Sequence, residues 1–147
     1  MRIVIDTNLV VRAARPQASL ARSILLEALS ERHSLILSNS LYFEIYKVMY
    51  YERVRALHGL DDEGILEFME ALAEGCVPVA THALGPGPLV PADPQDDHVL
   101  LAAIAGQADF LGTNNRHFFA PEVERIAASY GIRIVRDVDL IAALRQG

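Results

Sequence analysis

The sequence predicts a single α/β domain over residues 1–147, with three layers in which helices cover both faces of a central, mostly parallel sheet of about five strands. Two observations lead to this prediction. Short runs of β-branched and other apolar residues alternate along the chain with longer segments of helical periodicity. A chain of 147 residues is also long enough to bury one hydrophobic core. The single cysteine, Cys76, allows no intrachain disulfide, so a reducing compartment fits best.

The first half of the chain alternates apolar runs with amphipathic segments. Strands are predicted where β-branched residues cluster, and helices where apolar residues recur every three or four positions. Ser-Asn-Ser at residues 38–40 supplies a helix cap, and the acids at 61–63 suit the first turn of a helix. The predicted strands are residues 3–5, 35–37 and 77–79; the predicted helices are residues 19–32, 38–55 and 61–74, the last with Leu66, Met69, Leu72 and Ala73 facing inward.

The second half begins with a segment, residues 81–92, whose glycines and prolines predict a loop. Asp93 then has the position of a helix cap, with Pro94 in the first turn and Asp96 at the capping-box position. The helix that follows is apolar on nearly every side and should end at Gly106. The predicted helices of this half are residues 97–105, 121–130 and 138–145, and its strands are residues 108–113 and 132–135.

Charge and hydropathy narrow the classes of function. The net charge of -6 argues against general coating of nucleic acid, although it allows a local basic rim around an acidic cleft. Twelve of the thirteen basic residues are arginine, the residue suited to bidentate phosphate contacts. The sequence contains neither a signal-peptide pattern nor an apolar stretch long enough for a bilayer, so we expect a cytoplasmic protein without a membrane partner.

Three acids occupy positions that local structure does not explain. Asp6 directly follows the first predicted strand, and the carboxyl ends of parallel strands form the edge where α/β proteins bind ligands. Glu44 shares the inward face of its predicted helix, and Asp97 lies within the apolar helix. An ionised carboxylate on a buried face is costly unless it is paired or bound to a metal. For Glu44 the alternative is an ion pair with Lys47, three residues on.

A doubly wound topology can bring these three carboxylates to one edge, where they would repel one another. Protons or divalent cations must then neutralise them. The nearby oxygen donors Asn8, Thr113 and Asn115 complete an all-oxygen set, which suits Mg²⁺ or Mn²⁺ rather than zinc. Such a site can lower the pKa of a bound water and stabilise the charge that develops on a phosphodiester during in-line attack.

With these residues placed, nearly the whole chain resembles the PIN-domain family of ribonucleases, which includes the VapC-like toxins of bacterial toxin-antitoxin pairs. Four motifs carry the resemblance in order: Val-Ile-Asp-Thr-Asn at residues 4–8, Glu44, Asp-Pro-Gln-Asp-Asp at residues 93–97 before an apolar helix, and residues 108–115. The resemblance implies a metal-dependent endoribonuclease. It implies Asp6, Glu44 and Asp97 as catalytic metal ligands and Asp96 as a helper.

The resemblance also implies partners and one departure. Many members have an aspartate where this chain has Asn115 and another acid where it has His117. A neutral amide at that position predicts one tightly held metal ion and one loosely held or substrate-recruited ion. The family further implies an RNA substrate, a homodimer, and a cognate antitoxin that places a basic side chain among the carboxylates. Arg12, Arg15 and Arg116 follow the motif segments and are the candidates for substrate phosphate contacts.

Two alternative functions stay open. A phosphatase of the haloacid-dehalogenase type also begins with a strand and an aspartate, but it needs a second aspartate two positions on, where this chain has Asn8. The other alternative is a PIN-like scaffold, degenerate at Asn115, that binds RNA or a protein without cutting.

Overall fold

The computed structural model describes residues 1–81, 89–90 and 96–147, and its centre is a five-stranded sheet in which every neighbouring pair of strands is parallel. The spatial order is β3-β2-β1-β4-β5. The strands are β1 (Arg2–Ile5), β2 (Ser34–Ser38), β3 (Cys76–Val79), β4 (Phe110–Gly112) and β5 (Arg133–Val135). The predicted α/β class and all five predicted strands are confirmed.

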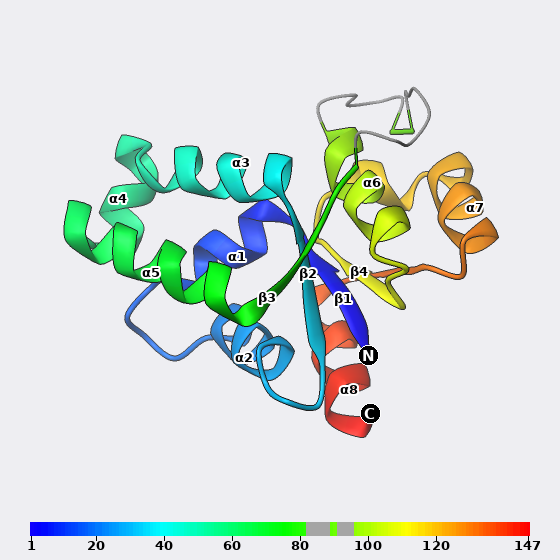
Figure 1. The fold of residues 1–147 in the computed structure, drawn as a ribbon, viewed down its shortest axis with the longest axis horizontal. Coiled ribbons are helices and arrows are strands. Elements are labelled where there is room, and N and C mark those ends of the chain that lie inside the picture. Colours follow the sequence, from blue (N-terminus) through cyan, green and yellow to red (C-terminus); the bar gives the residue numbers. More distant parts are fainter. Residues whose placement is uncertain (82–88, 91–95) are drawn as a thin grey trace.

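Helices connect the strands and cover the sheet (Figure 1). Helices α1, α2 and α8 pack together, whereas α6 lies against β1, β2 and β4, as expected when right-handed crossovers place helices on both faces. The α-helices are α1 (Thr7–Ala13), α2 (Leu20–Ala28), α3 (Asn39–Met49), α4 (Glu52–His58), α5 (Asp62–Gly75), α6 (Asp97–Ala105), α7 (Pro121–Ser129) and α8 (Asp137–Gln146), with a short 3-10 helix, η2 (Arg116–Phe119).

The helix predicted over residues 38–55 is wrong as a single element, because the structure breaks it into α3 and α4. Tyr51 adopts an extended backbone, with φ of -63° and ψ of 135°, so it cannot continue α3. Buried His58 stabilises the break, since its Nε2 lies 2.9 Å from the carbonyl oxygen of Met49 and its Nδ1 accepts from the backbone N–H of Leu60 at 2.9 Å. A side chain nine residues away thus satisfies the carbonyl that ends α3.

Other boundaries and faces differ from the prediction in smaller ways. Helix α1 was not predicted, and α2 ends four residues before residue 32, where the hydroxyl of Ser30 donates to the carbonyl of Glu27. In α5 the inward face is shifted: Ile65 is buried, whereas Leu66 is 44% exposed and Ala73 is also exposed. The prediction of Leu66 and Ala73 as inward residues is therefore wrong, although Met69 and Leu72 are buried as predicted.

The topology fixes where the chain can build a site. From β1 the chain proceeds outward to β2 and β3, and it then returns to the other side of β1 to form β4 and β5. The direction of winding therefore reverses between β1 and β4, and ligands of open α/β sheets bind outside the strand ends at such a reversal. The backbone N–H of Asp6 donates to the carbonyl of Gly112 at 2.9 Å, which joins the carboxyl ends of these two strands.

Two sequence predictions fall largely outside the described residues. These are the loop over residues 81–92, of which only Thr81, Leu89 and Val90 are described, and the cap at Asp93. Helix α6 has Gly106 as its C-cap, as predicted, but Asp97 is its first residue and Asp96 its N-cap, so Asp97 does not lie one turn inside the helix. Among the described helices, none combines the length and the apolar character that a membrane span requires.

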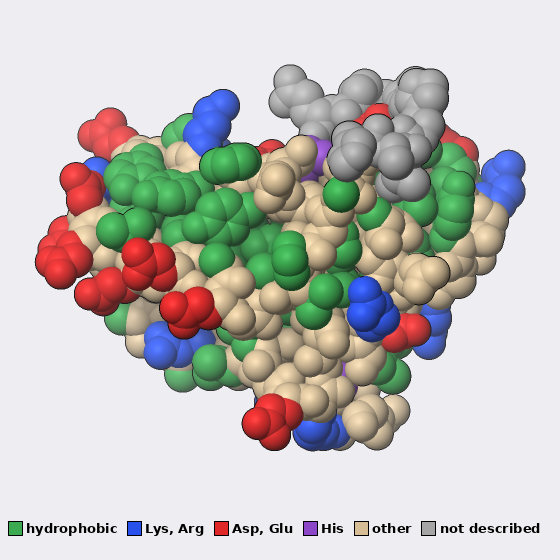
Figure 2. Space-filling model, in the orientation of Figure 1, with side chains coloured by type: hydrophobic (Ala, Val, Ile, Leu, Met, Phe, Trp, Pro, Cys, Tyr) green, Lys and Arg blue, Asp and Glu red, His purple; other side chains and the backbone are tan. Residues whose placement is uncertain are grey.

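One face of the molecule is apolar and acidic (Figure 2). Apolar side chains cover α3 there, and acidic side chains gather over α4 and α5. The aromatic rings of α3 contact one another along the helix, with the stacked centroids of Tyr46 and Tyr50 5.7 Å apart, and Phe43 is 65% exposed. Because phosphates are repelled by carboxylates, this face is a poor surface for a nucleic-acid backbone.

Candidate functional site

Asp6 is a buried acid at the carboxyl edge of the sheet. It is the N-cap of α1, and the residue is only 5% exposed. Its Oδ1 accepts from the backbone N–H of Thr7 at 2.8 Å, and its Oδ2 accepts from the hydroxyl of Thr113 at 2.7 Å. Thr113 follows β4, so the carboxylate of Asp6 is bonded from both strands that flank the reversal of the sheet.

Glu44 joins this group through Thr7 and His98. The hydroxyl of Thr7 donates to Glu44 Oε2, and His98 Nε2 lies 3.0 Å from the same oxygen. These contacts bring together α1, α3 and α6, the elements that carry the predicted acids. The alternative ion pair between Glu44 and Lys47 is not formed within the described part of the chain; His98, a residue of another helix, is the partner instead.

The two carboxylates respond differently to this environment. Burial raises the pKa of Asp6, and the charge of Glu44 raises it further, although hydrogen bonds from Thr113 and Thr7 oppose the rise. Burial also acts to raise the pKa of Glu44, but hydrogen bonds from His98 and Thr7 outweigh burial and lower it overall. Glu44 is therefore held ionised, whereas ionised Asp6 is disfavoured unless more positive charge is nearby.

His98 supplies part of that positive charge. Burial acts to lower the pKa of His98, but the hydrogen bond and the charge of Glu44, with smaller contributions from Asp96 and Asp6, raise it overall. Its Nδ1 is buried without a hydrogen-bond partner among the described residues. The three acids thus favour the protonated form of the imidazole.

Asp96 and Asn115 form a second, adjacent pair. The side-chain nitrogen of Asn115 donates to Asp96 Oδ2 at 2.8 Å, while its Oδ1 accepts from the backbone N–H of His117 at 3.0 Å. The backbone N–H of Asn115 donates to the hydroxyl of Thr113 at 3.0 Å. An aspartate at position 115 would face the carboxylate of Asp96, so the amide replaces a charge repulsion by a hydrogen bond.

Asp97 has a different arrangement from the other predicted ligands. Its Oδ1 accepts from two backbone N–H groups, those of Leu89 at 3.0 Å and Val90 at 2.8 Å. The first residue of α6 therefore anchors the backbone of Leu89 and Val90. This leaves Oδ2 as the oxygen through which Asp97 could serve as a ligand.

A pocket of about 270 Å³ opens beside Asp6. Four of its lining residues present carboxylate or amide oxygens, and the others are an exposed arginine and a buried leucine. The lining comprises Asp6, Asn8, Leu9, Arg12, Asn114 and Asn115. Of the three arginines predicted to contact phosphate, Arg12 lines this pocket, Arg15 lies in a neighbouring pocket, and Arg116 lines neither.

The donor chemistry of this pocket fits a hydrated Mg²⁺ or Mn²⁺ ion. Within residues 1–81, 89–90 and 96–147, no group of three His, Cys, Asp or Glu side chains is arranged to hold a metal. Magnesium, however, usually binds proteins through one or two carboxylates and keeps several of its waters. Asp6 supplies the carboxylate of this pocket, and Glu44, which is not among the lining residues, is joined to Asp6 through Thr7. The asparagine amides supply oxygens for the waters, and a cation would offset the effect of burial, which raises the pKa of Asp6.

Three residues of this cluster were not predicted from the sequence. Thr7 bridges Asp6 and Glu44, His98 pairs with Glu44, and Asn114 lines the pocket while its side chain binds Asp137. Thr7 could have been recognised, because it lies within the motif at residues 4–8. The pairing of His98 depends on how α3 and α6 pack, which no local pattern reports.

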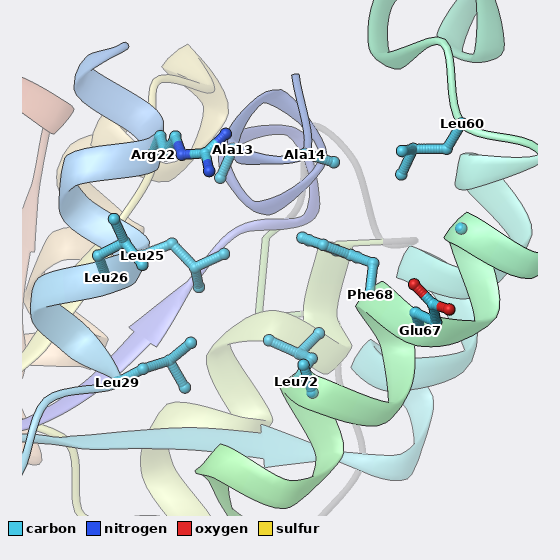
Figure 3. A pocket seen from close by; sticks show the side chains of 12 residues that line it. Ala13, Ala14, Arg22, Leu25, Leu26, Leu29, Leu60, Glu67, Phe68 and Leu72 are labelled. Atoms are coloured by element: carbon cyan, nitrogen blue, oxygen red, sulfur yellow. The ribbon is translucent and has the colours of Figure 1, made fainter. Parts of the chain in front are cut away.

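A larger pocket than the one beside Asp6 lies elsewhere and has different chemistry (Figure 3). It measures about 450 Å³ and lies between α1, α2 and α5. Leucine and alanine side chains and Phe68 form most of its wall, with Arg22 and Glu67 as its charged members. It has no cluster of carboxylates or amides, so the smaller polar pocket beside Asp6 is the candidate active site.

A family model described as PIN domain matches residues 2–117. This range includes all six predicted acidic and amide positions: Asp6, Asn8, Glu44, Asp96, Asp97 and Asn115. No curated protein matches the sequence.

Proposed function

The chain belongs to the PIN-domain family, and from that premise we propose that it is a metal-dependent endoribonuclease. PIN domains are typically nucleases, so hydrolysis of phosphodiester bonds is the general expectation. The observation that carries the proposal is the buried carboxylate of Asp6, bonded by Thr7 and Thr113 and facing a pocket lined by amide oxygens at the reversal of the sheet.

In this proposal Asp6 and Glu44 are the main ligands of Mg²⁺ or Mn²⁺, with Asp97 and Asp96 as further ligands. When bound, the ion supplies an activated water and stabilises the charge that develops on the phosphodiester. The residues around it act as positioning groups. Thr113 orients Asp6 and, through its bond from the N–H of Asn115, also fixes the segment that follows β4. Asn8 and Asn115 are supporting groups at the pocket wall.

The proposal predicts RNA cleavage that requires a divalent ion. Purified protein is incubated with a mixture of structured and single-stranded RNA in Mn²⁺, in Mg²⁺ and with excess chelator, and products are resolved on denaturing gels. Cleavage is expected in both metals, with complete loss in chelator and recovery when metal is restored. Cleavage that persists in chelator contradicts the proposal; RNA binding without cleavage in either metal favours the scaffold alternative.

We further propose that the protein is the VapC-like toxin of a toxin-antitoxin pair, acting in the cytoplasm as a homodimer. The family resemblance supports this role, and the acidic pocket offers a place for a basic side chain of an antitoxin. Induced expression alone should stop growth, and expression together with the product of the adjacent reading frame should restore it. Normal growth with the protein alone contradicts the toxin role. The phosphatase alternative is not retained, because the chain belongs to another family.

A further inference from the structure

A second hollow adjoins the candidate active site. It measures about 180 Å³, and it shares two lining residues, Leu9 and Arg12, with the pocket of Asp6. Because Asn8 and Arg12 are four residues apart, they lie on adjacent turns of one side of α1. The two hollows thus follow one another along α1, with Arg12 between them. The second is lined by Leu9, Arg12, Arg15, Ser19, Leu20, Ala21 and Asp137.

The charges of the second hollow favour an anion. Arg12 and Arg15 are exposed, and within the described ranges neither side chain makes a hydrogen bond or ion pair. The opposing charge is Asp137, whose two oxygens already accept from Asn114 Nδ2 at 2.9 Å and from the backbone N–H of Val138 at 2.7 Å. The hollow is therefore lined by two guanidinium groups that have no partner among the described residues and by one carboxylate whose oxygens are already hydrogen-bonded.

The position of Arg15 is also fixed by the fold. The side chain of Arg22, in α2, donates to the carbonyl of Arg15 at 3.1 Å and to the carbonyl of Pro16 at 3.4 Å. These bonds anchor the backbone that follows α1, so the side chain of Arg15 starts from a defined point. A preorganised arginine loses less freedom on binding an anion than one on an unanchored loop.

We propose that the second hollow binds the phosphate next to the scissile one, so that the RNA strand runs from Asp6 along α1 toward the start of α2. This inference rests on the proposed function and specifies its substrate as a polynucleotide that presents consecutive phosphates. Arg12 lies between the two phosphates, and Arg15 binds only the second. Arg116, which lines neither hollow, lies off this path.

Salt-dependent binding of RNA tests the proposed course of the strand along α1 without requiring cleavage. A labelled single-stranded RNA is titrated by fluorescence anisotropy at several salt concentrations, with Asp6→Asn in every protein to prevent cutting. Arg15→Ala should weaken binding several-fold and reduce the slope of log K against log salt by about 0.7, the value for one phosphate contact on a single strand. Arg15→Lys should keep most of the slope, and Asp137→Asn should tighten binding because it removes the opposing carboxylate.

Arg145→Ala is the matched control, because this exposed arginine is in the last turn of α8, near the carboxyl terminus and away from the strand ends that carry the site (Figure 1). It should change neither the affinity nor the slope. The inference is overturned if Arg15→Ala, like Arg145→Ala, changes neither the affinity for RNA nor the salt slope. It is also overturned if the salt slope falls in Arg116→Ala but not in Arg15→Ala. Circular dichroism of each variant verifies that the fold is intact.

Cleavage of two substrates separates this inference from the proposed function. In the background of wild-type Asp6, Arg15→Ala should lower kcat/KM for a long RNA several-fold but leave a dinucleotide, which has only the scissile phosphate between its sugars, unchanged. Equal losses on both substrates overturn the inference, as does the absence of any loss on the long RNA. If the wild-type protein cleaves neither substrate in Mn²⁺, the proposed function fails, and binding alone then decides whether the arginine path exists.

Discussion

Asp6→Asn is expected to lower RNA cleavage by about 10³-fold or more while raising the thermal stability of the protein. A metal site contributes several kcal/mol to stabilising the transition state, and each 1.36 kcal/mol is a factor of ten in rate. The amide keeps the size of the carboxylate but loses its charge. Its oxygen can still accept from the N–H of Thr7, and the hydroxyl of Thr113 can reorient to accept from its nitrogen.

The gain in stability follows from the direction of the pKa shift. Burial raises the pKa of Asp6 in the folded protein, so the folded state holds this proton more tightly than the unfolded state. Wild-type stability therefore falls as pH increases from the unfolded pKa through the raised folded pKa, and ionised Asp6 still lowers stability at neutral pH. Asp6→Asn removes the buried charge, and with it this loss of stability at neutral pH.

Cleavage assays in Mn²⁺ and melting curves measured with chelator at neutral pH check both parts of this prediction. Asp139→Asn, a change to an exposed acid of α8, should leave cleavage intact and give no such gain in stability. Full activity of Asp6→Asn contradicts the metal role of Asp6. A drop in its melting temperature contradicts the account of the buried charge.

Glu44→Gln is expected to lower cleavage by about 10²-fold or more, because it removes the carboxylate that the structure holds ionised. The glutamine oxygen can still accept from Thr7, so the connection between α1 and α3 is kept. His98 loses the charge of its partner, and its pKa should fall because Glu44 is the main influence that raises it against burial. NMR titration of the His98 ring in protein treated with chelator measures that fall.

Glu70→Gln is the matched control for this change, since Glu70 is an exposed acid on α5. Cleavage and the titration of His98 should both be unchanged in this variant. If Glu44→Gln cleaves RNA at the wild-type rate, Glu44 does not hold the catalytic ion. If the pKa of His98 is unchanged in Glu44→Gln, the ion pair between them is not the cause of its raised value.

The sheet edge and its main acid could be predicted because local sequence reports them. A β-branched run followed by an acid indicates the end of a buried strand, and alternation with helices implies parallel strands whose carboxyl ends meet. Asp6 and Thr113 are more than a hundred residues apart in the chain, and the structure joins them by a hydrogen bond, as a parallel arrangement of β1 and β4 allows.

The partners of the other acids could not be predicted, because they depend on packing. Helical spacing predicts Lys47 as the partner of Glu44, but an ion pair between neighbours on a helix surface contributes little to stability. The packing of α6 against α3 provides His98 as the partner instead. The break between α3 and α4 was missed for a similar reason, since His58 acts on Met49 through a turn of the chain. The helical spacing of apolar residues continues across the break, so the sequence pattern does not show where α3 ends and α4 begins.

The contacts of Asn115 change the interpretation of this residue. From the sequence it was a departure from the family pattern that predicted a weaker second metal site. In the structure its nitrogen donates to Asp96, so a hydrogen bond stabilises this carboxylate where an aspartate at position 115 would repel it. This arrangement supports the expectation of one tightly held ion, centred on Asp6.

The most direct test of the metal site is a crystal structure of the protein soaked in Mn²⁺, with anomalous scattering recorded above the manganese edge. We expect one strong anomalous peak in the pocket lined by Asn8 and Asn115, bound to Asp6 directly or through one water. A strong peak elsewhere, or an empty pocket in crystals of protein that cleaves RNA in Mn²⁺, would contradict a metal site at Asp6.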